Sequence, residues 1–140
     1  MTALLIGIFL VSCNMCSRPL VDSSVNHTIT DDSLLNLVQY QTFQYFWEGA
    51  EPISGMAREW IHLDNLYPQN DQIVVTIGGS GFGLMAILVG IERGFITREQ
   101  GFNRLRQIAV YLANADGFHG AWAHWLNGPT GKVYPFSKKD

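Results

Sequence analysis

The residues with the clearest chemical potential form a short run near the end of the chain. The run, Phe118-His119-Gly120-Ala121-Trp122-Ala123-His124-Trp125, holds two tryptophans and two histidines. An indole face packs on the apolar axial hydrogens of a sugar ring, and an imidazole can hydrogen-bond hydroxyl groups or orient a carboxylate. The run therefore indicates either a sugar-binding surface or a self-packed aromatic loop. We expect no metal and no cofactor, because His119 and His124 lack an HExxH frame or a third ligand.

Acidic side chains lie in and just after an irregular stretch from Glu51 to Asn70. Pro52, Gly55 and Pro68 interrupt any regular spacing of apolar residues there, which predicts a long connection. Such connections in compact domains are often functional. The charged and histidine side chains of this stretch, with the aspartate just beyond it, are Arg58, Glu59, His62, Asp64 and Asp71. Each of them, taken alone, is more typical of a solvated loop.

A glycine-rich turn, Thr76-Ile77-Gly78-Gly79-Ser80-Gly81-Phe82-Gly83, suggests chemistry that its spacing excludes. A dinucleotide-binding GxGxxG motif would need glycine at Leu84, and no Lys-Ser/Thr pair follows to make a P-loop. A nucleophile elbow around Ser80 would need glycine at Phe82. We therefore expect the small residues to let a helix begin close to a neighbouring backbone.

Three helices are predicted around these motifs. The first begins near Asp31 to Ser33 and ends before Pro52. The second runs from the glycine turn to Gly94 and is apolar on nearly every side, which is typical of a buried helix. Thr97 and Gln100 predict a capping box that begins a third, amphipathic helix. The inward positions of the first helix, judged by helical spacing, are Leu34, Leu35, Leu37, Val38, Gln41, Thr42, Tyr45 and Phe46.

The contrast between the second and third helices predicts an inner and an outer layer of an all-α assembly. Three helices cannot cover an apolar helix on every side, so we expect the chain to lack most of its helical partners or to borrow them from another chain. Towards the end, a turn at Asn127-Gly128-Pro129-Thr130-Gly131 separates two short extended arms. This pattern predicts an aromatic, hairpin-like loop.

The first residues resemble an export signal. The apolar run from Met1 to Val11 is too short to span a membrane, and Leu10-Val11-Ser12-Cys13 resembles a bacterial lipobox. We expect residues 1–12 to be a signal peptide, Cys13 to be acylated and inserted in a membrane, and residues 13–30 to form a polar tether. An ordinary secretory signal or a buried N-terminal helix would fit the same residues. The expected product is an exported lipoprotein of the periplasm or outer membrane.

The composition argues against nucleic acid as a partner. Of the 140 residues, 47% are hydrophobic and only 15% are charged, and the formal net charge is −3. A nucleic-acid-binding protein needs a cluster of lysine and arginine to neutralise phosphates, and this sequence has none.

Three motifs occur in a fixed order along the chain. They are Thr76-Ile77-Gly78-Gly79-Ser80-Gly81-Phe82-Gly83, Gly90-Ile91-Glu92-Arg93-Gly94-Phe95-Ile96-Thr97-Arg98-Glu99, and His119-Gly120-Ala121-Trp122-Ala123-His124-Trp125, the last followed by Asn127-Gly128 and Thr130-Gly131-Lys132. With this content and order the sequence resembles the bacterial glucoamylase-like family, which includes endo-β-1,2-glucanases. The resemblance covers residues 34–140. It implies that residues 31–140 are the N-terminal part of an α/α toroid of inner and outer helix pairs, incomplete in this chain.

The resemblance also implies a glucan cleft and roles for individual residues. Inverting glycoside hydrolysis uses a carboxylic acid and a carboxylate about 6.5–9.5 Å apart. The carried-over catalytic candidates are Asp71, as base or positioning residue, and Glu59. The residues implied to line the sugar site are Ser80, Phe82, His119, Trp122, His124 and Trp125. The sequence departs from the family at Trp60, where arginine is usual, and the family's further acidic residue lies beyond Asp140.

The expected function is that of the N-terminal portion of an exported glycoside hydrolase acting on β-1,2-glucan or a related β- or α-glucoside. Because a catalytic acid is expected downstream, these 140 residues alone are expected to be inactive. The alternative is a non-catalytic lipoprotein that binds glycans or a partner protein.

Overall fold

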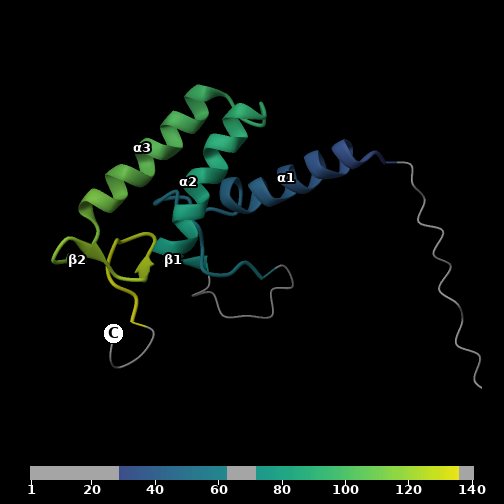
Figure 1. Cartoon of the computed structure of the whole chain (residues 1–140). Coiled ribbons are helices and arrows are strands. Elements are labelled where there is room, and N and C mark those ends of the chain that lie inside the picture. The colour runs from purple at the N-terminus through teal and green to yellow at the C-terminus, as the bar shows by residue number, and fades with distance from the viewer. Residues whose placement is uncertain (1–28, 63–71, 136–140) are drawn as a thin grey trace, which may run out of the picture.

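The computed structural model describes residues 29–62 and 72–135, and it is mainly helical, as expected (Figure 1). Two antiparallel helices, α2 and α3, pack against each other, and α1 crosses beside α2. Short strands gather at the end where α2 begins and α3 ends. The elements are α1 (Asp31–Trp47), β1 (Val74–Thr76), α2 (Ile77–Glu92), α3 (Arg98–Asn114), β2 (Gly117–Phe118), β3 (Ala121–Trp122) and β4 (Trp125–Asn127).

Helix α1 begins where the sequence predicted, but it packs through only part of its length. The Thr30 hydroxyl accepts a hydrogen bond from the Ser33 amide (3.3 Å), which caps the helix. Contacts with the rest of the chain begin at Gln39, whose side chain accepts from Arg93 Nε (2.7 Å), and at Tyr40, whose ring meets Phe95 edge-on. The expected inward positions before them, Leu34, Leu35, Leu37 and Val38, are exposed among the described residues. The predicted inward face was wrong further along as well: Gln41, Thr42 and Tyr45 are exposed, Phe46 is half-buried, and the buried residue of α1 is Phe43.

The connection between α2 and α3 follows its sequence signals. Gly94 adopts a left-handed backbone conformation (φ 70°) just after α2 ends. The Gln100 amide donates to the Thr97 hydroxyl (3.1 Å), and the Thr97 amide donates to the Gln100 side chain (2.7 Å). The predicted capping box at the start of α3 is therefore confirmed.

Helix α2 is buried on one face only. The buried positions on this face are Ser80, Gly83, Ile87 and Gly90. The large apolar side chains on its other faces are exposed among the described residues; they are Phe82, Met85, Leu88 and Val89. The predicted burial on all sides is thus not reached here, because α1 and α3 cover only part of the helix. This agrees with the expectation that three helices cannot enclose it.

A small antiparallel sheet not foreseen from the sequence lies at the start of α2. Strand β1 pairs with β4, with Val74 opposite Asn127 and Thr76 opposite Trp125. Residues 57–59 run along the other side of β1, where the Glu59 amide donates to the Val74 carbonyl (3.0 Å) and the Thr76 amide to the Ala57 carbonyl (3.1 Å). We call residues 57–59, β1 and β4 the three-segment array.

The predicted hairpin-like loop is confirmed on the far side of β4. The Asn127 amide donates to the Lys132 carbonyl (2.7 Å), and the Gly131 amide donates to the Asn127 carbonyl (2.8 Å). Leu126 and Val133 form an antiparallel bridge between the two arms. Residues 127–131 therefore make the turn that their glycines and proline indicated.

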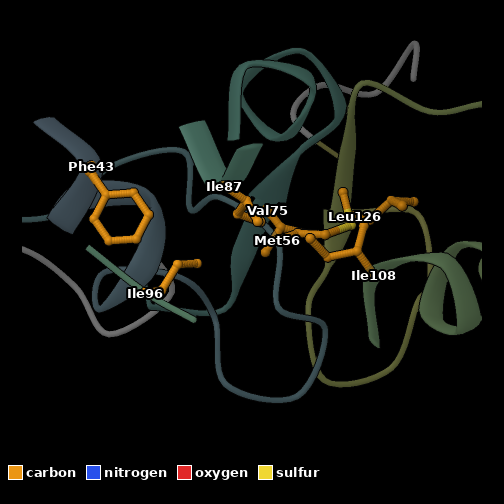
Figure 2. Close-up of a cluster of buried hydrophobic side chains, with 7 residues drawn as sticks. All are labelled: Phe43, Met56, Val75, Ile87, Ile96, Ile108 and Leu126. Atoms are coloured by element: carbon orange, nitrogen blue, oxygen red, sulfur yellow. The ribbon is translucent and has the colours of Figure 1, made fainter. Parts of the chain in front are cut away.

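One hydrophobic cluster joins the helices to the array. In Figure 2, Ile87 lies between Phe43 and Ile96 on one side and Met56, Val75, Ile108 and Leu126 on the other. Met56 is completely buried, although it belongs to the connection that the sequence marked as irregular. The connection therefore supplies core packing as well as loop residues.

Two glycines of α2 should respond differently to alanine. A Cβ at Gly90 would lie 2.5–3.0 Å from ring atoms of Phe43, which is too close for a rigid ring that is itself buried. Overpacking of this kind costs about 1–3 kcal/mol, so Gly90→Ala should lower the free energy of unfolding despite a helix-propensity gain of about 1 kcal/mol. Urea denaturation of the protein expressed from its complete gene measures this change.

The matched control is Gly81→Ala in the same helix. No described atom outside its own helix backbone and chain neighbours lies within 4 Å of a Cβ at Gly81. Within the described residues nothing opposes the propensity gain of about 0.5–1 kcal/mol, so Gly81→Ala should lower the free energy of unfolding less than Gly90→Ala does. Equal effects of the two substitutions would contradict the packing assigned to Phe43 and Gly90.

Candidate functional site

The candidate site is built on the junction between the three-segment array and the first turn of α2. The Ile77 amide, at the start of the helix, donates to the His124 carbonyl (3.1 Å) just before β4. The Ser80 hydroxyl accepts from the Ala57 amide (3.0 Å). These two bonds connect α2 to both outer segments of the array, so the side chains of the array have fixed positions relative to the helix.

Glu59 and Trp125 lie on the same face of the array. In antiparallel pairing, directly opposed residues share a face, and so do residues two apart along one strand. Glu59 is aligned with Val74, and Ala57 with Thr76, which is paired in turn with Trp125. A predicted catalytic carboxylate and a predicted sugar-binding tryptophan are thus brought to one surface. His124 is exposed beside them, and its ring meets that of Trp125 edge-on (centroids 4.4 Å apart).

The two predicted site residues on α2 differ in accessibility. Phe82 is 74% exposed, so its ring is available to a ligand. Ser80 is only 5% exposed, and its hydroxyl is engaged with the Ala57 amide. Ser80 therefore attaches residues 57–59 to α2. Its role in sugar binding stays a prediction.

His119 and Trp122 lie on a separate hairpin formed by β2 and β3. Its two-residue turn has positive φ at His119 (52°) and Gly120 (82°), the backbone that type I′ hairpin turns require. Trp122 pairs with Gly117 in the hairpin, and its Nε1 donates to the Leu112 carbonyl at the end of α3 (3.0 Å). The predicted sugar-binding residues therefore form two groups, one on the array and α2 and one on the β2–β3 hairpin, at the same end of the helices (Figure 1).

Two predicted functional residues lie outside the described residues. They are the catalytic candidate Asp71 and the lipidation candidate Cys13. Both assignments stay predictions from the sequence. None of the helices in residues 29–62 and 72–135 has the length and apolarity that a bilayer-crossing segment needs. Over the same residues, no three His, Cys, Asp or Glu side chains are grouped as metal ligands.

The electrostatic surroundings of Glu59 include a tyrosine. The Tyr45 hydroxyl donates to the Arg58 carbonyl (2.8 Å). Burial raises the pKa of Tyr45, the negative charge of Glu59 raises it further, and the positive charge of Arg58 opposes both. Tyr45 therefore stays protonated beside Glu59 and can keep donating its hydrogen bond to the backbone next to that carboxylate.

Glu51 is a buried acidic residue that sequence reasoning missed. Its side chain accepts hydrogen bonds from the Ile53 amide (3.1 Å), the Ser54 amide (2.7 Å) and the Ser54 hydroxyl (2.7 Å). The signal was present as an acid followed three residues later by serine and then glycine, the composition of a tight, side-chain-capped turn. Glu51 folds the connection immediately before residues 57–59.

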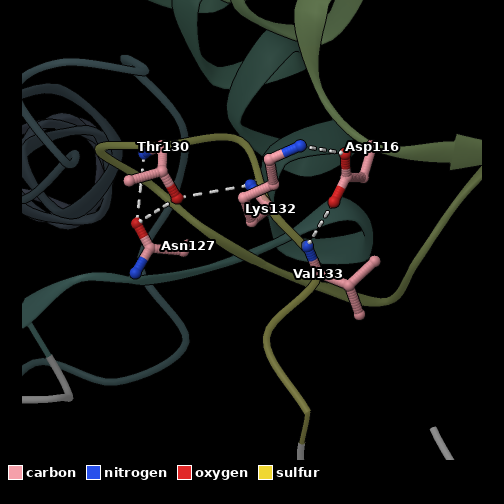
Figure 3. A network of polar contacts seen from close by, with 5 residues as sticks. All are labelled: Asp116, Asn127, Thr130, Lys132 and Val133. Atoms are coloured by element: carbon pink, nitrogen blue, oxygen red, sulfur yellow. Dashed lines mark hydrogen bonds and ion pairs between the residues drawn. The ribbon is translucent and has the colours of Figure 1, made fainter.

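Asp116 was also missed, and it joins the end of α3 to the last described arm. Its carboxylate accepts from Lys132 Nζ (2.9 Å) and from the Val133 amide (3.2 Å), as Figure 3 shows. Hydrogen bonds from Lys132 and Val133 lower the pKa of Asp116, which stays ionised at neutral pH. In the same arm, Asn127 Oδ1 accepts from the Thr130 amide and hydroxyl (3.1 and 2.9 Å). The network fixes the arm beside the β2–β3 hairpin.

Tyr111 should make stability sensitive to alkaline pH. Its hydroxyl donates to the Asn127 carbonyl (3.0 Å), and burial, helped by the negative charge of Glu51, raises its pKa to about 12. A folded-state pKa above the unfolded value of about 10 gives stability that is complete below pH 10 and is lost as the pH rises towards 12. Urea midpoints measured from pH 8 to 12 should therefore fall more steeply for wild type than for Tyr111→Phe.

At pH 8 the phenylalanine variant should be less stable, because it lacks the hydrogen bond to Asn127. The difference between the two proteins should then shrink above pH 10. A difference that stays constant up to pH 12 would show that the Tyr111 hydroxyl does not titrate abnormally.

Comparison with known proteins gives the family. No model of a protein family matches the chain. An exo-β-1,2-glucooligosaccharide sophorohydrolase of Parabacteroides distasonis is 51% identical over 114 residues, which are 81% of this chain and 15% of that protein. Among solved structures, an endo-β-1,2-glucanase from Chitinophaga pinensis in complex with sophorotriose and glucose is 65% identical, with a TM-score of 0.77 over 79% of this chain and 27% of that one.

A β-1,2-glucanase from Parabacteroides distasonis is 49% identical, with a TM-score of 0.69 over 77% of this chain and 14% of that one. The chain thus spans about a seventh to a quarter of the length of these relatives. Identity at this level, over most of the chain and with the same backbone arrangement, shows common ancestry. The chain belongs to the glucoamylase-like family that includes these β-1,2-glucan hydrolases.

Proposed function

We propose that the chain is part of an exported glycoside hydrolase that cleaves β-1,2-glucan by acid/base-assisted inversion. The observation that carries the proposal is the 65% identity to an endo-β-1,2-glucanase and the 51% identity to a sophorohydrolase. Both relatives are hydrolases of β-1,2-linked glucans. Similarity to them supports a β-1,2-glucan substrate over the α-glucosides that the sequence left open.

The array supports a division of roles within this site. Glu59 is exposed in part, lies on the Trp125 face and is followed by the exposed Trp60, so a sugar chain could reach its carboxylate. We assign Glu59 and Asp71 to the catalytic machinery, with Phe82, His124 and Trp125 at the sugar nearest to it and His119 and Trp122 further along. In the complete protein α2 would be an inner helix and α3 an outer helix of an α/α toroid.

The proposed export rests on the lipobox-like sequence around Cys13. A membrane-anchored lipoprotein of the periplasm or outer membrane would meet glucan outside the cytoplasm. Metabolic labelling with a radioactive fatty acid should mark the wild-type protein and leave Cys13→Ser unlabelled. Equal labelling of both would remove the anchor from the proposal without affecting the proposed hydrolysis.

The hydrolase proposal is tested with the protein expressed from its complete gene. Release of new reducing ends should be rapid from β-1,2-glucan and at background level from starch. The anomeric configuration of the first product, followed by NMR, should be inverted. Binding of β-1,2-glucan without any release of reducing ends would refute the hydrolase and favour the non-catalytic glycan-binding lipoprotein.

A further inference from the structure

The arm that follows the loop after β4 adds a fourth segment to the array. Leu126 of β4 and Val133 form an antiparallel bridge, and the Tyr134 amide donates to the Trp125 carbonyl (3.0 Å). In antiparallel pairing this register places Tyr134 directly opposite Trp125. The 132–134 arm therefore lies beside β4 on the side away from β1.

Tyr134 lies on the face of the array that carries Glu59. Directly opposed residues share a face, and successive residues along a strand alternate between faces. Trp125 is paired with Thr76 of β1. Thr76 is aligned with Ala57, which is two residues before Glu59. Tyr134 extends this row by one position, so a candidate catalytic carboxylate, a predicted sugar-binding tryptophan and a tyrosine share one surface.

The row from Ala57 to Tyr134 has one covered end and one accessible end. At the covered end, a Cβ at Gly79 of α2 would lie within 4 Å of the Thr76 and Ala57 side chains. Thr76 and Ala57 are accordingly buried. At the other end, Trp125 and Tyr134 are half-buried, so part of each residue is open to solvent. A ligand could therefore reach the row at its aromatic end.

Hydrogen bonds on both sides fix the 132–134 arm. On the β4 side, the Tyr134 amide is bonded to the Trp125 carbonyl. On the other side, Asp116 accepts from Lys132 Nζ (2.9 Å) and from the Val133 amide (3.2 Å), as Figure 3 shows. The backbone that carries Tyr134 is thus attached to both β4 and the end of α3. A preformed surface reduces the ordering that a ligand must cause on binding.

The chemistry of this aromatic end suits a neutral sugar. Aromatic rings pack against C–H groups, and a phenol hydroxyl can donate or accept a hydrogen bond. A glucose unit offers both C–H and hydroxyl groups. The four segments lie in the order 57–59, β1, β4 and 132–134. Neighbouring strands are about 4.8 Å apart, so the segment of Tyr134 is about 14 Å from that of Glu59, beyond Trp125.

We propose that Tyr134 is a further sugar-binding residue of the site, which packs its ring and donates its hydroxyl to a glucosyl unit of β-1,2-glucan beside Trp125. The proposal rests on the proposed β-1,2-glucan hydrolase. Tyr134 lies outside the three sequence motifs and outside the set of sugar-binding residues that they implied. Its separation from Glu59 assigns it to binding and not to the chemical step.

The test compares Tyr134→Ala and Tyr134→Phe with wild type, each expressed from the complete gene. Tyr134→Ala should raise KM for β-1,2-glucan about 10-fold, the combined loss of an aromatic contact and a hydrogen bond, while kcat stays unchanged. Tyr134→Phe keeps the ring and loses only the hydroxyl, so its KM should rise about threefold. Calorimetric titration in an Asp71→Asn background, where hydrolysis should be slow, should show the same factors in Kd.

Val133→Ala is the matched control. Val133 precedes Tyr134 in the same arm, but it is paired with Leu126, so its side chain lies on the opposite face. Its truncation should leave KM unchanged. Melting temperatures show whether each variant is folded. An equal rise in KM for Val133→Ala and Tyr134→Ala would mean that the whole arm positions the site, and it would overturn a direct contact between Tyr134 and sugar.

The outcomes separate this proposal from the proposed hydrolase. If wild type hydrolyses β-1,2-glucan and Tyr134→Ala has wild-type KM, the sugar contact is overturned and the hydrolase stands. If wild type releases no reducing ends but binds β-1,2-glucan more tightly than Tyr134→Ala does, the hydrolase is overturned and the sugar contact stands. Binding that is equal or absent in both proteins, without hydrolysis, would overturn both.

Discussion

The Asp71→Asn variant of the protein from the complete gene should release reducing ends from β-1,2-glucan about 10²- to 10⁴-fold more slowly than wild type. A positioned general base contributes a factor of this size, and an amide cannot accept the proton of the attacking water. The fall should be in kcat with little change in KM, because asparagine keeps the shape and most hydrogen-bonding capacity of aspartate.

Asp64→Asn is the matched control for Asp71→Asn. It removes the same charge from the same stretch of sequence, seven positions before Asp71. We expect this variant to keep activity within about twofold of wild type, because the family resemblance carries a catalytic role over to Asp71 and not to Asp64. Initial rates at saturating and at low substrate separate kcat from KM. An Asp71→Asn variant with wild-type kcat would remove Asp71 from the catalytic machinery and leave Glu59 as the candidate from this chain.

The helices were predictable because their signals are local. A capping box at Thr97 and Gln100 and a glycine at position 94 act within one turn of the chain, so their outcome does not depend on distant residues. The pairing of β1 with β4 brings Val75 opposite Leu126, fifty-one positions further along, and nothing in a three-residue strand specifies such a partner. The same holds for the burial of Met56, which depends on α3 and β4 reaching the same place.

The candidate site was predictable in residue type but not in arrangement. Motifs marked His119, Trp122, His124 and Trp125 as one aromatic run, but the tight turn at His119 and Gly120 folds the first half into a hairpin of its own. The run therefore supplies two surfaces. Glu51 escaped notice because its role depends on burial and on backbone donors, neither of which is visible in residue type alone.

Glu51→Ala should strongly destabilise the fold, although Glu51 is a charged residue in a connection between elements. Glu51 is 3% exposed and its side chain accepts three hydrogen bonds, so its removal leaves the buried amide and hydroxyl of Ser54 and the part-buried amide of Ile53 without their acceptor. Unsatisfied buried donors of this kind cost about 1–3 kcal/mol each, so the free energy of unfolding should fall by about 3 kcal/mol or more. The midpoint of urea denaturation, followed by tryptophan fluorescence, measures this loss.

The surroundings of Glu51 explain why the loss should reach the site. A Cβ at Gly128 would lie only 2.6–2.8 Å from Glu51 side-chain atoms, so the glutamate packs directly on the turn that follows β4. The Glu51 amide donates a hydrogen bond to the carbonyl of Met56, the residue that directly precedes residues 57–59. Loss of Glu51 should therefore loosen both outer segments of the array, and KM for β-1,2-glucan should rise together with the fall in stability.

Glu48→Ala and Glu51→Gln complete the experiment. Glu48 is exposed and lies three residues earlier, so its replacement should change stability by less than about 0.5 kcal/mol. Glutamine at position 51 keeps one carbonyl oxygen as an acceptor but presents an amide group to the second donor, so it should be intermediate. The free energy of unfolding should be highest for Glu48→Ala, intermediate for Glu51→Gln and lowest for Glu51→Ala. This order follows from the number of hydrogen-bond donors around position 51 that keep a partner. If all three variants unfolded at the same urea concentration, the buried carboxylate would not organise the connection, and the position of Glu59 would have to depend on β1 alone.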